Sequence, residues 1–392
     1  MAAPSDRPSQ HTAPESRRHG ARFASGGVRG FLSANITGSA MSLAVCAWLL
    51  GRAPKSKLTT LLGSIHDAQA RALFHGHWNL RFEDLYIEAF KIHGEYQTYF
   101  GIWPTLLRMP VLAITNRFDG ALTGPSILVA VAVALAASAG IQWELRSMFD
   151  APNHVEAPDP LDRRDHVGVV EVFDQLQPIT LSRGQWFATA GFQMMLGTGS
   201  VVAFLASYPL VYHEMEMWGI AGGLASAWAV IRFSRAPSVR ASMFLCAATA
   251  IAILSRPSVG VGVLVTIAVV WILRALRWKR RGASLRHLVT LAVAAMLPLA
   301  MFCLMNNARF GTPLSVPLDK QVFTMGDAAH HFPGNPQRQL AMASNHGSLF
   351  GLHYLPTTVV QYLRPDAFRF DSQFPFINKS ECFRLICFDG AL

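Results

Sequence analysis

The feature that most constrains this chain is an apolar run at residues 122–143, which contains no charged side chain. A stretch of about 20 apolar residues is long enough for one α-helix to cross the hydrocarbon core of a bilayer. Further apolar segments occur at residues 36–50, 187–208, 218–233, 241–254, 259–273 and 288–305. Together they predict an all-α fold, a polytopic transmembrane helix bundle of about seven spans.

The composition agrees with a membrane protein. Hydrophobic residues make up 51% of the chain and charged residues 15%, whereas soluble domains carry about 25% charged residues. The formal net charge of +10 would suggest nucleic acid as a partner of a soluble protein. Here the basic residues lie beside apolar segments, as they do in cytoplasmic loops. We therefore expect the lipid bilayer, and no nucleic acid, as a partner.

Basic residues also predict the orientation of the bundle. With seven spans, three basic groups fall on one side, which the positive-inside rule makes cytoplasmic. The groups are Arg17, Arg18, Arg22 and Arg29; Arg232, Arg235 and Arg240; and Arg274, Arg277, Lys279, Arg280, Arg281 and Arg286. We expect a multi-pass plasma-membrane protein whose N-terminus is cytoplasmic.

The chain divides into three predicted regions. Residues 1–35 are rich in Ser, Pro, Gly and Arg, which favours a disordered, basic cytoplasmic tail. Residues 36–305 form the transmembrane helical domain, with a long first outer loop at 52–121 and a polar cytoplasmic linker at 144–185. Residues 306–392 follow the last apolar segment and form an extracytoplasmic tail.

The first outer loop contains an expected juxtamembrane amphipathic helix. Its apolar residues recur with helical spacing, and such a stripe can lie flat on a membrane surface. They are Leu58, Leu61, Leu62, Ile65 and Ala72. Asp67 falls on the opposite, water-facing side, one turn before Arg71. A carboxylate held there could act as a general base; the alternative is an ordinary exposed ion pair between Asp67 and Arg71.

The loop is also rich in histidine, at His66, His75, His77 and His93. A zinc site normally needs three or four well-placed ligands, and these residues show no such spacing. We expect structural or interfacial roles for them and no metal site.

Other candidate residues lie at the mouths of the predicted spans. Tyr99 and Trp103 either form an interfacial aromatic belt or stack on the face of a sugar. His213 and Glu214 lie between the third and fourth segments, where ionisable groups at membrane depth usually serve function. The alternative is that these two residues lie only at the interface.

Two arginines flank later segments. Arg256 interrupts an apolar stretch together with Pro257, and Arg309 follows the seventh segment. The guanidinium fork matches phosphate oxygens, so both are candidate contacts for a lipid phosphate. The alternative is that their side chains extend to the headgroups of bulk lipid.

These features together resemble the GT-C superfamily of integral membrane glycosyltransferases, and more narrowly uncharacterised actinobacterial multi-span proteins of that type. The resemblance covers the chain from about Ile36 onward. It rests on residues 65–70 (IHDAQA), 76–77 (GH), 99–110 (YFGIWPTLLRMP), 212–214 (YHE), 254–257 (LSRP) and 307–313 (NARFGTP).

The resemblance implies transfer of a sugar from a polyprenyl-phosphate donor to a cell-envelope glycan or lipid acceptor at the outer face. It implies that Asp67 is the catalytic base and that Glu214 is a second acid. The substrate contacts would come from Arg71, Tyr99, Trp103, His213, Arg256 and Arg309. Some relatives bind a divalent metal, so the cofactor stays open.

The chain departs from the family pattern by its fewer spans and by an acid motif with the single Asp67, where many relatives have paired acids. The alternatives are therefore a non-catalytic membrane protein, such as a transporter or lipid-handling scaffold, or an inactive truncated relative. Convergence of Asp67, Glu214, Arg256 and Arg309 on one outer cavity would favour the enzyme.

Overall fold

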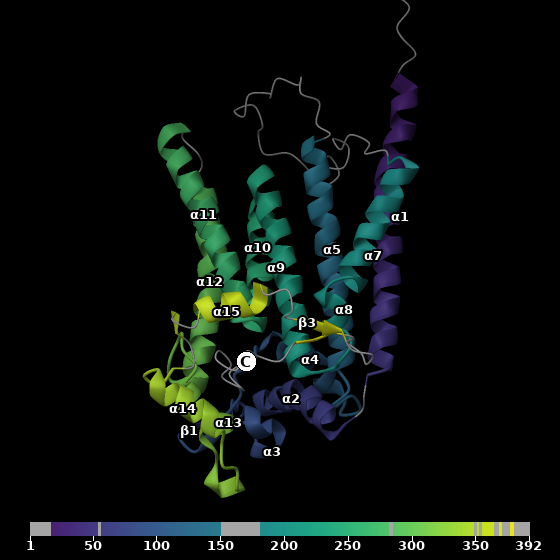
Figure 1. Cartoon of the computed structure of the whole chain (residues 1–392). Helices are drawn as coiled ribbons and strands as arrows, with labels where there is room; N and C mark the ends of the chain where they lie inside the picture. The colour runs from purple at the N-terminus through teal and green to yellow at the C-terminus, as the bar shows by residue number, and fades with distance from the viewer. Residues whose placement is uncertain are drawn as a thin grey trace, which may run out of the picture.

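The computed structural model describes residues 17–53, 56–149, 181–281, 285–348, 351–352, 355–363, 368–370 and 377–379. The described chain is mostly helical, and its long helices run side by side as a bundle (Figure 1). They are α1 (Arg17–Gly51), α5 (Thr123–Phe149), α7 (Arg183–Thr198), α9 (Val211–Arg235), α10 (Val239–Ser255), α11 (Pro257–Arg281) and α12 (Leu285–Phe310). The short helix α8 (Val201–Leu205) follows α7.

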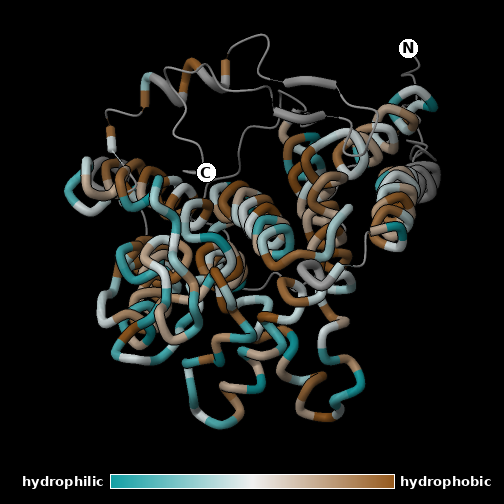
Figure 2. Tube along the Cα trace, turned by 60° about the horizontal axis from the view of Figure 1, so that its bottom comes forward, coloured by the Kyte–Doolittle hydropathy of each residue, from teal (hydrophilic) through white to brown (hydrophobic). Residues whose placement is uncertain are grey.

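Four of the described helices are long and apolar enough to cross a membrane: Val28–Gly51, Thr123–Met148, Pro257–Leu276 and Leu285–Phe310. Apolar residues lie along the bundle helices, while hydrophilic residues gather largely in the loops (Figure 2). This supports a helical membrane protein. The full number of spans and their orientation stay predictions.

The third predicted segment is not one continuous helix. It is split into α7 and α8 at Gly199 and Ser200, where the Ser200 hydroxyl accepts a hydrogen bond of 3.2 Å from the Val202 amide. Serine at this position caps the first turn of a new helix and so favours a break. The preceding linker lies outside the described residues between 150 and 180.

Small residues allow the helices to approach closely at the centre of the bundle, where α9 packs against α5 and α10. Gly222 of α9 faces the backbone of Ala252, and Gly140 of α5 faces the Trp228 ring so closely that an added Cβ would collide. Close backbone approach through small residues is how membrane helices associate.

The first loop folds across one end of the bundle as α2 (Lys57–Phe74), α3 (Phe82–Leu85), β1 (Phe90–Ile92), β2 (Glu95–Gln97) and α4 (Trp103–Ile114) (Figure 1). Strands β1 and β2 form an antiparallel hairpin. Its turn residues, His93 and Gly94, both have positive φ, at 49° and 88°. That geometry matches the right-handed twist of a two-residue hairpin.

The expectation that the apolar stripe of α2 lies on a membrane surface is wrong. Leu62 and Ile65 are buried in a cluster with Phe100 of the loop and with Val211 and Met215 of α9. The protein itself covers this part of the stripe, because the remainder of the loop folds back over α2.

The chain beyond α12 forms α13 (Val322–Met325), α14 (Pro336–Ser344), α15 (Leu355–Leu363) and an antiparallel pair, β3 (Phe368–Phe370) with β4 (Ile377–Lys379). Of these elements, α13 packs on the first loop. The Val322 amide donates to the Ala89 carbonyl at 2.8 Å. The Asp327 carboxylate accepts from Lys91 at 2.8 Å and from the Tyr96 hydroxyl at 2.5 Å. The start of the predicted tail is therefore an ordered partner of the loop.

The predicted disordered N-terminal region is also partly helical. Helix α1 begins at Arg17, inside the segment 1–35 that the composition assigned to a disordered tail. Residues 1–16 and 380–392 lie outside the described residues.

Candidate functional site

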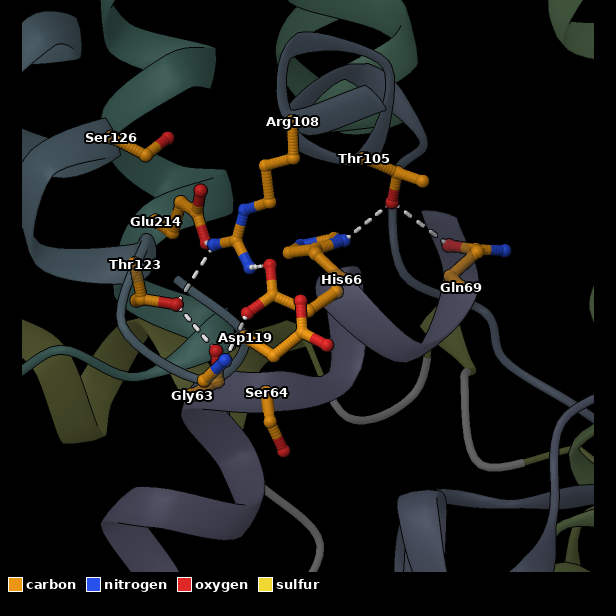
Figure 3. Close-up of polar contacts among 12 residues, drawn as sticks. Gly63, Ser64, His66, Gln69, Thr105, Arg108, Asp119, Thr123, Ser126 and Glu214 are labelled. Atoms are coloured by element: carbon orange, nitrogen blue, oxygen red, sulfur yellow. Dashed lines mark hydrogen bonds and ion pairs between the residues drawn. The ribbon is translucent and has the colours of Figure 1, made fainter. Parts of the chain in front are cut away.

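The candidate site is built around Arg108 of α4, whose guanidinium lies between two carboxylates (Figure 3). Its Nη1 donates to Asp67 Oδ1 at 2.7 Å, and its Nη2 donates to Glu214 Oε2. The side chains of Arg108, Asp67 and Glu214 are 2%, 4% and 0% exposed. Burying charges is costly unless they are paired, so each member of this triad needs the others.

Backbone and hydroxyl groups complete the triad. Thr123, at the start of α5, accepts from Arg108 Nη2 at 2.8 Å and donates to the Gly63 carbonyl at 2.5 Å. The Gly120 amide donates to Asp67 Oδ2 at 2.6 Å. The interactions join α2, α4, α5 and α9, and they fix the Asp67 carboxylate in position.

Asp67 is therefore a buried carboxylate, 4% exposed, rather than an exposed residue on a water-facing side of α2, which corrects the sequence-based expectation. The alternative, an exposed ion pair between Asp67 and Arg71, is not formed either. Arg71 instead pairs with Asp119 at 2.8 Å and donates to the Leu112 and Thr115 carbonyls at 2.6 and 3.2 Å. Arg71 thus satisfies carbonyls at the end of α4, which have no partner within that helix.

A second polar group lies beside Asp67 on α2. His66 Nδ1 is 2.9 Å from the Thr105 hydroxyl, which donates to Gln69 Oε1 at 3.1 Å. Burial lowers the pKa of His66 well below its usual value, and the positive charges of Arg108 and Arg309 lower it further. The imidazole is therefore neutral at physiological pH.

Asp67 borders an open cavity of about 790 Å³ at the loop end of the molecule. The polar residues that line it supply both hydrogen-bond donors and acceptors. They are Ser64, Asp67, Arg71, His75, His77, Asn79, Arg81, Asp84 and Asp119. A cavity of this size and polarity can hold a ligand such as a sugar, with the fixed carboxylate of Asp67 at its wall.

The aromatic candidates and His213 do not line this cavity. Trp103 packs edge-on against Trp218, with ring centroids 6.0 Å apart. The Tyr99 hydroxyl hydrogen-bonds the Glu88 carboxylate, and His213 Nδ1 lies 3.1 Å from the Tyr208 carbonyl. These contacts are internal to the protein.

The two candidate phosphate ligands are also engaged by protein groups. Arg256 pairs with Glu216 at 2.6 Å. Arg309 is buried, donates to the Phe100 carbonyl at 2.9 Å and lies 5.2 Å from the centroid of the Trp78 ring. Neither lines the cavity. The structure joins Asp67 to Glu214 through Arg108, but it does not bring all four predicted residues to one cavity.

Sequence reasoning missed Arg108, which holds the two acids together. A signal was present, because Arg108 is the only charged residue within the twelve residues of α4. A lone charge on an otherwise apolar helix is costly to bury and predicts a buried partner of opposite charge. Asp119 and Thr123 carried no comparable signal, since both are common residue types at turns and helix starts.

Within the described parts of the chain, no group of three or more His, Cys, Asp or Glu residues is placed to hold a metal ion. Comparison with protein-family models, with curated proteins and with solved structures found no match.

Proposed function

We propose that this chain is an integral membrane glycosyltransferase of GT-C type. It would move a sugar from a polyprenyl-phosphate donor to a cell-envelope acceptor at the outer face of the plasma membrane. The observation that carries the proposal is the position of Asp67, a carboxylate fixed by Arg108 and Gly120 at the wall of an open polar cavity. The apolar bundle beside the cavity is suited to a lipid-linked donor.

In the proposed reaction, Asp67 takes the proton of an acceptor hydroxyl. That oxygen forms a bond to the anomeric carbon as the bond from this carbon to the phosphate breaks, and polyprenyl phosphate leaves. Each carboxylate oxygen has two acceptor lone pairs, so Asp67 retains capacity for the hydroxyl beside its two protein contacts. General base catalysis of this kind typically contributes about 10²–10⁴-fold.

Glu214 acts in this proposal as a positioning residue. It is fully buried and does not line the cavity. Its contact with Arg108 Nη2 orients the guanidinium, whose Nη1 then holds Asp67. Arg71, at the cavity wall, remains the predicted substrate contact best placed to meet a ligand.

The test compares envelope glycans and lipid-linked sugars in a deletion strain that carries the wild-type chain, Asp67→Asn or Asp319→Asn. Asp319 is a matched control, because its side chain is 51% exposed and, among the described residues, its ion pair is with Lys320 alone, outside the cavity. We expect the deletion to lose one glycan and to accumulate its lipid-linked donor. Wild type and Asp319→Asn restore the glycan, and Asp67→Asn does not, although the variant reaches the membrane fraction. Restoration by Asp67→Asn would refute the assigned base.

A non-catalytic transporter or lipid-handling scaffold is the second candidate. It is favoured by the internal contacts of Arg256 and Arg309, which leave the cavity without the predicted phosphate ligands. An unchanged glycan and lipid-linked sugar profile in the deletion strain would favour this candidate over the enzyme.

A further inference from the structure

A second hollow lies at the other end of the molecule, in the seam between α11 and α12. Its volume is about 520 Å³, and these helices stand at the edge of the bundle, with their junction at the end opposite α2 (Figure 1). The lining is entirely apolar. It includes Trp271, Ala275 and Leu276 of α11 and Leu288, Val289 and Ala292 of α12.

The sequence explains why the seam is hollow. Ala275 and Ala292 are the smallest residues that line it. Their short side chains leave space that larger side chains at these two positions would fill. Trp271 crosses the seam, since its indole Nε1 donates to the Leu288 carbonyl at 3.0 Å. That bond joins the two helices and keeps the tryptophan ring at the groove.

The charge around this groove is positive. The junction carries Arg274, Arg277, Lys279, Arg280, Arg281 and Arg286, and residues 217–318 contain no Asp or Glu. Arg286 is exposed one residue from Leu285, which lines the groove. Among the described residues, no carboxylate forms an ion pair with Arg286.

We propose that the groove between α11 and α12 binds one acyl chain of an anionic phospholipid, whose headgroup phosphate pairs with Arg286 at the start of α12. Apolar lining suits the chain, and clustered Lys and Arg beside a membrane helix suit the anionic headgroup. A second copy of this protein would bring the same basic residues to the interface, where like charges repel. The site is separate from the cavity at Asp67.

Trp271 gives a direct readout of the occupant. Bromine on a lipid acyl chain quenches tryptophan fluorescence on contact. The protein has nine tryptophans, so the signal of Trp271 must be separated from the others. The signal from Trp271 is the difference between the wild-type chain and Trp271→Phe, both reconstituted in phosphatidylcholine vesicles. Equal small fractions of brominated phosphatidylglycerol or brominated phosphatidylcholine are then added.

We expect brominated phosphatidylglycerol to quench Trp271 more strongly than brominated phosphatidylcholine. Arg286→Gln lowers this preference by about fivefold, the value of one basic side chain at an anionic surface. Arg240→Gln is the matched control, because Arg240 is an exposed basic residue on α10 outside the groove. This control keeps the preference of the wild-type chain.

A second measurement does not depend on replacing the tryptophan. Native mass spectrometry counts phosphatidylglycerol retained by the wild-type chain and by Ala292→Leu, in which a larger side chain fills the groove. We expect one tightly held lipid in wild type and its loss in the variant.

Equal quenching of Trp271 by brominated phosphatidylglycerol and brominated phosphatidylcholine would show that the groove contacts only bulk lipid, and this result would overturn the proposal. Cross-linking of Ala275→Cys to a second copy, together with protection of Trp271 from both lipids, would assign the groove to a dimer and also overturn it. Neither readout uses glycosyl transfer, so failure here leaves the proposed activity to its own test.

Discussion

Arg108 Nη1 donates to Asp67 Oδ1 at 2.7 Å, which joins α4 to α2 across 41 residues of chain. The other terminal nitrogen of the same guanidinium contacts Glu214 at the start of α9. One buried cation thus unites the first loop with the bundle. The cavity wall at Asp67 is consequently as rigid as the packing between these helices.

Replacing Arg108 should lower the free energy of unfolding far more than replacing an exposed arginine. Arg108→Met leaves two buried carboxylates without a counterion, and we expect about 3–5 kcal/mol less stability in denaturant unfolding in detergent. Arg81→Met is the control, since the Arg81 side chain is 78% exposed and solvent screens its pairing with Asp84, so this variant should keep the wild-type stability.

Neutralising the acids as well should recover most of this loss. In Arg108→Met/Asp67→Asn/Glu214→Gln no buried charge remains, and we expect the triple variant to be more stable than Arg108→Met alone. If the stability losses of the three single variants simply add in the triple variant, the three residues do not act as one unit.

The buried His66 predicts a pH dependence of stability. Its pKa is lowered in the folded state, so the unfolded chain binds a proton below pH about 6.5 that the folded chain does not. Stability is therefore fully present above this pH and falls as the pH drops below it. The slope is at most about 1.4 kcal/mol per pH unit for one proton.

The measurement is the unfolding midpoint of His66→Gln and of the wild type between pH 7.5 and 5, values that bracket the ordinary histidine pKa of about 6.5. We expect a flatter pH profile in His66→Gln. The exposed His75 supplies the control, and His75→Gln should keep the wild-type slope. An unchanged slope in His66→Gln would assign the effect to another group.

Asp327 predicts acid-sensitive docking of the segment beyond α12. Burial raises the pKa of Asp327, but hydrogen bonds to its carboxylate outweigh burial and hold the pKa well below its usual value. The side-chain donors are Lys91, Tyr96 and His330. A lowered carboxyl pKa stabilises the fold above the ordinary value of about 3.9, and this contribution is lost as the pH falls from there towards the folded pKa.

Hydrogen exchange at the β1–β2 hairpin checks this prediction. In the wild-type chain we expect protection to hold at neutral pH and to weaken below pH about 4. Asp327→Asn should weaken protection already at neutral pH, because an amide cannot replace the charged acceptor for Lys91. Equal protection in the variant and the wild type at neutral pH would show that the apolar contacts of Val322 suffice.

The helices of the bundle were predictable because their signal is local. A long apolar run needs its backbone groups satisfied within the segment, and in a membrane only a helix or a closed barrel does so. The structure contains helices at each predicted apolar segment, although Gly199 and Ser200 divide one of them. The amphipathic period of α2 also predicted a helix correctly.

What covers that helix was not predictable from its period. An apolar stripe has the same pattern whether lipid or protein buries it. Ile65 is buried in one cluster with Phe100 and Met215, which lie far along the chain from it. The exposure of Asp67 was misjudged for the same reason. Helical spacing placed Asp67 opposite the stripe, but α4 and α9 cover that side as well.

By itself the sequence determined where apolar helices form and that charge is scarce within them, because hydropathy is a property of each segment. Only the tertiary structure decided that Arg108 meets Asp67 and Glu214, because that contact requires α2, α4 and α9 to fold together. It also placed Asp67 at a cavity and left Arg256 and Arg309 with partners inside the protein. Long-range ion pairs of this kind depend on the packing of whole helices, which no local pattern records.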